Sequence, residues 1–244
     1  MLPSEPHQSL SDGIECLMLL AGAPRPMPVG DIADRLGLDV IRARRLLQTL
    51  VHAGLAALTS ERRYRLGHAA HALGARCLAG SGALAAALPV LADLAPGSSI
   101  ELGTLWRDEV TILHRRSAVG HLEAPPRDPL AATRSAIGLA LLAWHSADEV
   151  RGLFTAIDGS LKPVPGFPSY GDLVEALDHA RASGHARLLV SSHPHSQALA
   201  MAIGDPPCMA VAVTGAFSDD QASIIAALRA AVARIAAALP RSQR

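Results

Sequence analysis

Hydrophobic positions recur at helical spacing in the N-terminal part of the chain. This periodicity predicts three helices, at residues 9–20, 29–36 and 39–53. Ser9 or Ser11 is a candidate N-cap for the first helix, and Asp39 is a good N-cap for the third. Gly37 should end the second helix, because glycine readily adopts the left-handed conformation found just beyond helix C-termini.

Two short apolar runs follow these helices and predict a β-hairpin. They lie at residues 55–58 and 64–66 and flank the polar segment 59–63. Three helices followed by a hairpin form the winged helix-turn-helix arrangement, in which the third helix faces outward from its scaffold.

Beyond the hairpin, helical and strand-like patterns are interleaved along the chain. Further helices are predicted at residues 68–78, 84–94, 135–144, 148–154, 172–182 and 218–239. Strands are predicted at residues 99–106, 110–115, 187–190, 198–203 and 209–214. This mixture indicates an α/β (α+β) chain. Because 50% of the residues are hydrophobic but only 3% are aromatic, its core must be largely aliphatic.

The predicted helix at residues 39–53 has two distinct sides on a helical wheel. One side is continuously apolar and is formed by Ala43, Leu46, Leu47, Leu50 and Val51. The opposite side carries Ile41, Arg45, Gln48 and His52, with Arg42, Arg44 and Thr49 on its flanks and Val40 at the start of the helix.

A solvated helix face is the simplest interpretation of this polar side, but we favour a DNA-reading face. After Asp39 the face carries no acid that could neutralise its arginines. Arg can pair with guanine, Gln with adenine, and an aliphatic group can touch a thymine methyl. We expect Arg45 to be the central reader, with Arg42 and Arg44 better placed for phosphates.

The charge distribution supports this interpretation although the formal net charge is zero. A zero total argues against a globally basic nucleic-acid-binding surface. Residues 35–65, however, contain seven arginines and only two acids, Asp39 and Glu61. Arg62 and Arg63, at the predicted hairpin tip, are candidates for phosphate or minor-groove contacts.

Three features of the sequence indicate a cytoplasmic protein. Cys16, Cys77 and Cys208 lie far apart, which offers neither a disulfide framework nor a zinc site. The N-terminus lacks the basic and apolar regions of a signal peptide. No uninterrupted apolar run approaches the roughly 20 residues needed to span a bilayer.

Several motifs make the chain resemble the IclR-type bacterial transcription regulators. They are DIADRLGLDVIRARRLLQTLVHAGL (31–55), RRYRLG (62–67) and SAIGLALLA (135–143), the last of which is similar to the family's TALGKALLA helix. RASGHA (181–186) stands where the family has a GYA-type turn. The chain departs from the family at Val40, Ile41 and Arg42, where small hydroxyl residues are common.

The resemblance implies three parts and a regulatory function. These are a winged helix-turn-helix domain at 1–67, a linker helix at 68–82, and a GAF-like effector-binding and oligomerisation domain at 83–244. Homodimers or homotetramers would bind a double-stranded DNA operator. The implied effector-binding residues are Thr133, Ser135, Ala136, Ile137, Gly138, Ser196, Gln197, Ala198, Ala212 and Thr214.

These positions offer hydroxyls, backbone N–H groups and the N-terminus of the helix that follows Ser135, which together suit a carboxylate. We therefore expect a small organic acid as effector, with an aromatic acid as one possibility. For Thr133 and Ser135 a simple N-capping role is an equal alternative.

Other chemistries are weakly supported by the sequence. His193 and His195 could suggest a metal, but no nearby Cys, Asp or Glu completes a ligand set. Ser191, Ser192 and Ser196 lie beside these histidines without a GxSxG elbow or an acid that would orient a base. We expect no metal, no cofactor and no catalytic activity. A small-molecule enzyme or a DNA-binding-deficient sensor remains the alternative.

Overall fold

The computed structural model describes residues 7–124, 126, 130–156, 158–190, 196–217 and 221–239. The chain divides into two compact units, Met1–Gly80 and Ser81–Arg244. This boundary falls within the segment expected to form a linker helix.

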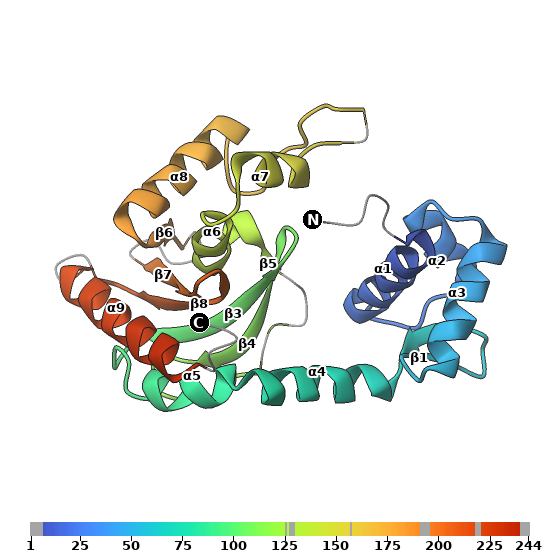
Figure 1. Ribbon diagram of the computed structural model, residues 1–244, viewed down its shortest axis with the longest axis horizontal. Coiled ribbons are helices and arrows are strands. Elements are labelled where there is room, and N and C mark those ends of the chain that lie inside the picture. The colour runs from blue at the N-terminus through green and yellow to red at the C-terminus, as the bar shows by residue number, and fades with distance from the viewer. Residues whose placement is uncertain are drawn as a thin grey trace. The chain divides into compact units, whose positions relative to one another are not determined.

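The first unit contains a group of packed helices, a small hairpin and a further helix that follows the hairpin (Figure 1). Its elements are α1 (Gln8–Gly22), α2 (Val29–Leu36), α3 (Val40–His52), β1 (Ala56–Leu58), β2 (Tyr64–Leu66) and α4 (His68–Ser81). β1 and β2 are antiparallel. The core is aliphatic, with Ile32, Leu47 and Leu20 packed around Cys16 and Tyr64. The predicted winged helix-turn-helix is therefore confirmed.

The helix ends of this unit follow from local chemistry, with one exception. Gly37 ends α2 in the left-handed conformation, with φ of 63°. The side chain of Asp39 caps α3 and accepts a hydrogen bond from the backbone N–H of Arg42 at 2.9 Å. The predicted serine cap of α1 is wrong, because α1 already begins at Gln8 and its cap residue, His7, makes no side-chain capping bond.

The second unit is built on one antiparallel sheet of six strands. In spatial order they are β5 (Leu130–Ala131), β4 (Glu109–Arg116), β3 (Ser99–Trp106), β8 (Pro207–Gly215), β7 (Gln197–Gly204) and β6 (Ala186–Leu189). Its helices are α5 (Ala83–Leu91), α6 (Ala136–Leu142), α7 (Ala147–Leu153), α8 (Tyr170–Ser183) and α9 (Gln221–Ala238), and a 3₁₀ turn, η1, spans Ala132–Arg134. The predicted mixed α/β class is confirmed.

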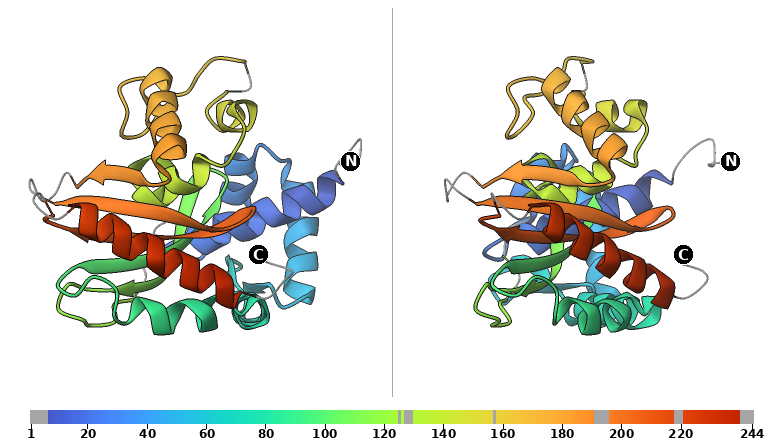
Figure 2. Two further views of the ribbon diagram at one scale, coloured as in Figure 1. Left: turned by 60° about the vertical axis from the view of Figure 1, so that its left-hand side comes forward. Right: turned by 90° about the vertical axis from the view of Figure 1, so that its left-hand side faces the viewer.

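Helices cover both faces of this sheet, so the unit has two hydrophobic cores (Figure 2). On one face α6 and α8 pack over alanines of the central strands, such as Ala200 and Ala212. On the other face α5 and α9 pack over larger side chains, such as Leu199 and Val211. This division follows from strand alternation, since successive residues point to opposite faces of a sheet.

By length and composition α9 is apolar enough to cross a membrane. Its inner face, however, carries the buried residues Leu228, Ala231 and Ile235, which belong to the core beneath the sheet. A core helix of a globular domain shows this same pattern of one buried stripe.

Candidate functional site

The outer face of α3 is the first candidate site. The inner face of the helix is fixed by Ala43, Leu47 and Leu50, which are buried. Opposite them, Ile41 is 74% exposed, and Val40 at the start of the helix is 44% exposed. Both aliphatic side chains are therefore accessible to a partner on the outer side of the helix.

The polar residues of this face are also exposed, as the helical wheel predicts. They are Arg44, Arg45, Gln48, Thr49 and His52. In the described ranges neither Arg44 nor Arg45 has an ion-pair partner. The Thr49 hydroxyl donates a hydrogen bond to the backbone carbonyl of Arg45 at 3.0 Å, so in this arrangement it can act toward a partner only as an acceptor.

Arg42 differs from the other arginines of α3 because it is bound to another helix. Its Nη2 lies 2.5 Å from Oδ2 of Asp12, on α1. This partner could not be predicted from the sequence, because Asp12 lies 30 residues earlier and in another helix, α1.

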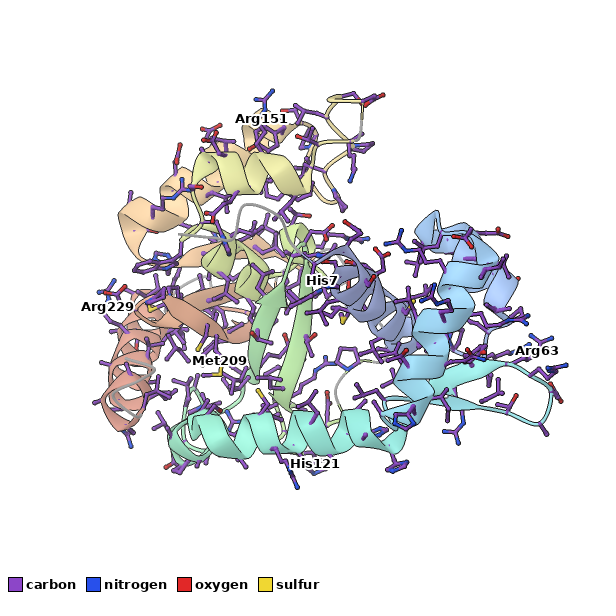
Figure 3. All side chains as sticks on the ribbon, turned by 45° about the vertical axis from the view of Figure 1, so that its right-hand side comes forward. His7, Arg63, His121, Arg151, Met209 and Arg229 are labelled. Atoms are coloured by element: carbon purple, nitrogen blue, oxygen red, sulfur yellow. The ribbon has the colours of Figure 1, made fainter. Side chains whose placement is uncertain are left out.

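The hairpin tip places two more arginines at the surface. Arg62 has a positive φ of 58° in the turn between β1 and β2. The backbone N–H of Arg63 donates to the Thr59 hydroxyl at 3.2 Å, and its Nε lies 3.6 Å from a carboxylate oxygen of Glu61. Figure 3 shows Arg63 at the tip, pointing away from the hairpin.

The second candidate site is a cavity of about 850 Å³ in the second unit. Six residues of the implied effector set line it, namely Thr133, Ser135, Ala136, Ala198, Ala212 and Thr214. The sheet register explains the grouping. Thr214 pairs with Ser99 on one side and with Ala198 on the other, and Ala212 pairs with Glu101.

Charged residues of the cavity wall were not predicted from the sequence. Glu101 and Arg115 are cross-strand partners on β3 and β4. Nε of Arg115 lies 3.1 Å from Oε1 of Glu101 and 3.1 Å from Oε2 of Glu123. Arg134 also lines the cavity, and among the described residues it has no ion-pair partner. Arg134 is also exposed, so its guanidinium can pair with an anionic ligand.

Burial perturbs the acid of this wall. It raises the pKa of Glu101 above its usual 4.5, the positive charge of Arg115 lowers it, and Glu123 raises it again. The net shift is upward, so burial outweighs the adjacent guanidinium.

The two candidate hydroxyls of the cavity differ in their availability. Oγ1 of Thr133 donates to the carbonyl of Pro165 at 2.6 Å, which fixes the 163–167 segment to η1, the turn that precedes α6. Ser135 is buried at the N-cap position of α6, and its side chain makes no capping hydrogen bond. The Ser135 hydroxyl is therefore the one left available to a ligand.

Four residues of the implied set do not line this cavity. Ile137 is fully buried in the core, and Gly138 packs directly against the backbone of Ala132. Strand alternation puts Gln197 on the face of the sheet that carries Leu199 and Met201, opposite the cavity. Ser196 accepts, through its carbonyl, a hydrogen bond from the backbone of Val190 at 3.0 Å.

The residues weighed for other chemistries lie mostly outside the described ranges. These are Ser191, Ser192, His193 and His195. Among the residues that are described, no cluster of His, Cys, Asp or Glu is arranged to hold a metal ion.

Comparison with known proteins assigns the N-terminal unit. The family model of the IclR helix-turn-helix domain matches residues 9–59. The HTH-type transcriptional regulator KdgR of Escherichia coli (strain K12) is 27% identical over 171 residues, covering 67% of this chain and 64% of that protein. The match thus spans less than two thirds of the length of this relative.

Solved structures share the fold of nearly the whole chain. An IclR family transcriptional regulator from Brucella abortus has a TM-score of 0.73 at 19% identity, covering 97% of this chain and 94% of that chain. An IclR homolog from Microbacterium hydrocarbonoxydans, complexed with 4-hydroxybenzoate, has a TM-score of 0.61 at 22% identity, covering 94% and 98%. At these identities the likeness concerns the fold.

Proposed function

Because the chain belongs to the IclR type of transcription regulators, we propose that it binds operator DNA through α3 and the β1–β2 hairpin. The outer face of α3 carries this proposal. Ile41 and Arg45 are exposed there beside Gln48, opposite a buried apolar face. An exposed helix face of this composition suits the major groove of DNA, where arginine, amide and aliphatic side chains each have a matching base edge.

The residues of this interface have different roles in the proposal. Arg45 is the central base reader, with Ile41, Gln48 and His52 beside it on the exposed face. Arg44 lies on the flank, and Arg62 and Arg63 lie at the hairpin tip, where each can bind phosphate.

A gel shift with the DNA upstream of the chain's own gene tests this function. Arg45→Ala should weaken binding by about 1–3 kcal/mol if a paired guanine contact is lost. Arg229→Ala, an exposed arginine of α9, removes the same formal charge from the second unit and should leave the affinity nearly unchanged. Equal affinity of the wild type, Arg44→Ala and Arg45→Ala would contradict the reader assignment.

For the second unit we propose a small carboxylic acid as effector, bound in the cavity beside Arg134 and Ser135. The cavity, about 850 Å³, is large enough for a small organic acid. Arg134 offers a forked set of donors that matches a carboxylate, and the Ser135 hydroxyl is free of a capping bond. The homolog complexed with 4-hydroxybenzoate supports aromatic acids as the first candidates.

Calorimetric titration with 4-hydroxybenzoate, benzoate and a panel of aliphatic carboxylates tests the effector class. Arg134→Gln should weaken any acid that binds by roughly 10-fold or more, since hydrogen bonds to charged groups contribute about 1.5–3 kcal/mol. Arg151→Gln, on the exposed face of α7, is the control. A folded protein that binds none of these acids would overturn the carboxylate proposal.

The remaining parts of the proposal concern assembly and activity. We propose that a cytoplasmic homodimer or homotetramer binds the operator, without a catalytic activity of its own. Light scattering with and without operator DNA measures the number of chains, and a monomer on DNA would contradict this part.

A further inference from the structure

A buried carboxylate in the first unit is bound to the recognition helix. Asp12 of α1 is only 7% exposed. Its Oδ1 accepts a hydrogen bond from Nε2 of Gln8, one helical turn earlier, at 2.7 Å. Its Oδ2 lies 2.5 Å from Nη2 of Arg42. Within the described part of the chain Oδ2 is buried and has no hydrogen-bond partner, so the ion-pair contact with Arg42 is the polar contact it makes. Arg42 is therefore the counter-charge of this acid.

The two partners of this contact differ in burial, because the side chain of Asp12 is 9% exposed and that of Arg42 is 41% exposed. A buried ionised carboxylate needs a partner, because leaving it without one is strongly unfavourable in a medium of low dielectric constant. Arg42 is also held at its backbone, since its N–H donates to the Asp39 cap. The guanidinium is thus drawn toward α1, whereas Arg44 and Arg45 of the same helix are exposed.

We propose that Asp12 is a positioning residue that holds Arg42 against α1 and keeps its charge from the DNA. This inference rests on the proposed DNA-binding function. An arginine that binds phosphate releases a counterion and steepens the salt dependence of binding. An arginine already neutralised by a buried carboxylate adds no such release. Arg42 then orients α3, and the phosphate contacts are made by Arg44 and the hairpin arginines.

The salt dependence of binding to a labelled duplex of arbitrary sequence tests this assignment without knowledge of the operator. The measured quantity is the ratio of Kd at 200 mM salt to Kd at 50 mM salt. One phosphate contact changes this ratio about 3.5-fold, which corresponds to a slope of about 0.9 per contact. Arg44→Gln should lower the ratio by this factor. Asp12→Asn, which preserves the shape and can still accept from Gln8, should raise it, because Arg42 is released.

Removal of Arg42 is the decisive comparison. Arg42→Gln leaves Asp12 without a partner, so the double variant Asp12→Asn/Arg42→Gln serves as the neutral replacement of the pair. Both should show the salt ratio of the wild type. A decrease in both equal to that of Arg44→Gln would overturn the inference, because Arg42 would then be a phosphate contact. A wild-type salt ratio in Asp12→Asn would overturn it as well.

Two further outcomes separate this inference from the function on which it rests. A wild-type chain that binds no duplex at 50 mM salt would overturn the proposed function together with this inference. Urea unfolding tests the ion pair alone. Each single variant should lower the unfolding midpoint, and the double variant should recover part of the loss. Fully additive losses would show that the two residues are not coupled.

Discussion

Glu101 and Arg115 face each other across β3 and β4, with Nε of Arg115 3.1 Å from Oε1 of Glu101. The same nitrogen lies 3.1 Å from Glu123, in the segment that follows β4. The guanidinium of Arg115 is thus shared by two carboxylates. It therefore compensates only part of the negative charge of Glu101, the more buried of the two. Burial therefore raises the pKa of Glu101 although Arg115 is adjacent.

We expect Glu101→Gln to gain stability relative to the wild type as the pH rises. Because the pKa of Glu101 in the folded state lies above its usual 4.5, the folded state retains a proton that the unfolded state has released. The wild type consequently loses stability between pH 4.5 and the folded pKa, whereas glutamine does not ionise. Urea unfolding from about pH 4 to about pH 7 measures the difference in free energy of unfolding.

The control for this prediction is Glu109→Gln, an exposed carboxylate at the start of β4. The difference in free energy of unfolding between Glu109→Gln and the wild type should change little over the same pH interval. A Glu101→Gln variant that becomes less stable relative to the wild type as the pH rises would contradict the upward shift.

Gly138→Ala should destabilise the second unit. A Cβ at this position would lie 2.1 Å from the carbonyl oxygen of Ala132 and 2.4 Å from its Cα. Both are backbone atoms in the turn that leads into α6, so the helix must shift. Overpacking of this kind costs about 1–3 kcal/mol, to be measured as the free energy of unfolding.

Gly152→Ala in α7 is the matched control, because a Cβ there meets nothing within 4 Å. Alanine should instead stabilise α7 by about 0.5–1 kcal/mol. Equal effects of Gly138→Ala and Gly152→Ala on the free energy of unfolding would contradict the close packing of α6 against Ala132.

The elements were largely predictable from the sequence because local signals define them. The bounds of α2 and β3 agree with the predicted ranges, since Gly37 ends α2 and a polar turn ends β3. The start of α1 was not predictable in this way. Two serines satisfy the capping rule, yet the helix begins before both, at Gln8.

The sites were predictable only in part, since local sequence does not determine which residues of neighbouring strands pair. Alternation alone puts Ala212 and Thr214 on one face of β8. It does not say that Glu101 lies opposite Ala212, nor that Arg115 follows on the next strand. The position of Gln197 could have been found, because it directly precedes Ala198 on β7 and must point to the other face.

Thr133→Val should lower the free energy of unfolding by about 1–3 kcal/mol. The substitution keeps the shape of the side chain but removes the 2.6 Å hydrogen bond to the carbonyl of Pro165. That carbonyl then loses its donor at a position where Thr133 itself is buried. Thr133→Ser retains the hydroxyl and should lose less. Equal stability of the wild type and the valine variant would show that this hydrogen bond does not hold the 163–167 segment.

The three cysteines should differ in reactivity. Cys16 is fully buried, and burial, with the nearby charges of Asp12 and Glu15, raises the pKa of its thiol to about 11. Cys77 and Cys208 are exposed. Iodoacetamide at about pH 8 should therefore add two groups to the folded protein and a third only in urea, as counted by mass spectrometry. Burial also raises the pKa of Cys208, so its alkylation should accelerate as the pH rises. Rapid alkylation of Cys16 under native conditions would contradict the packing of α1 in the first unit, and with it the buried setting in which Asp12 holds Arg42.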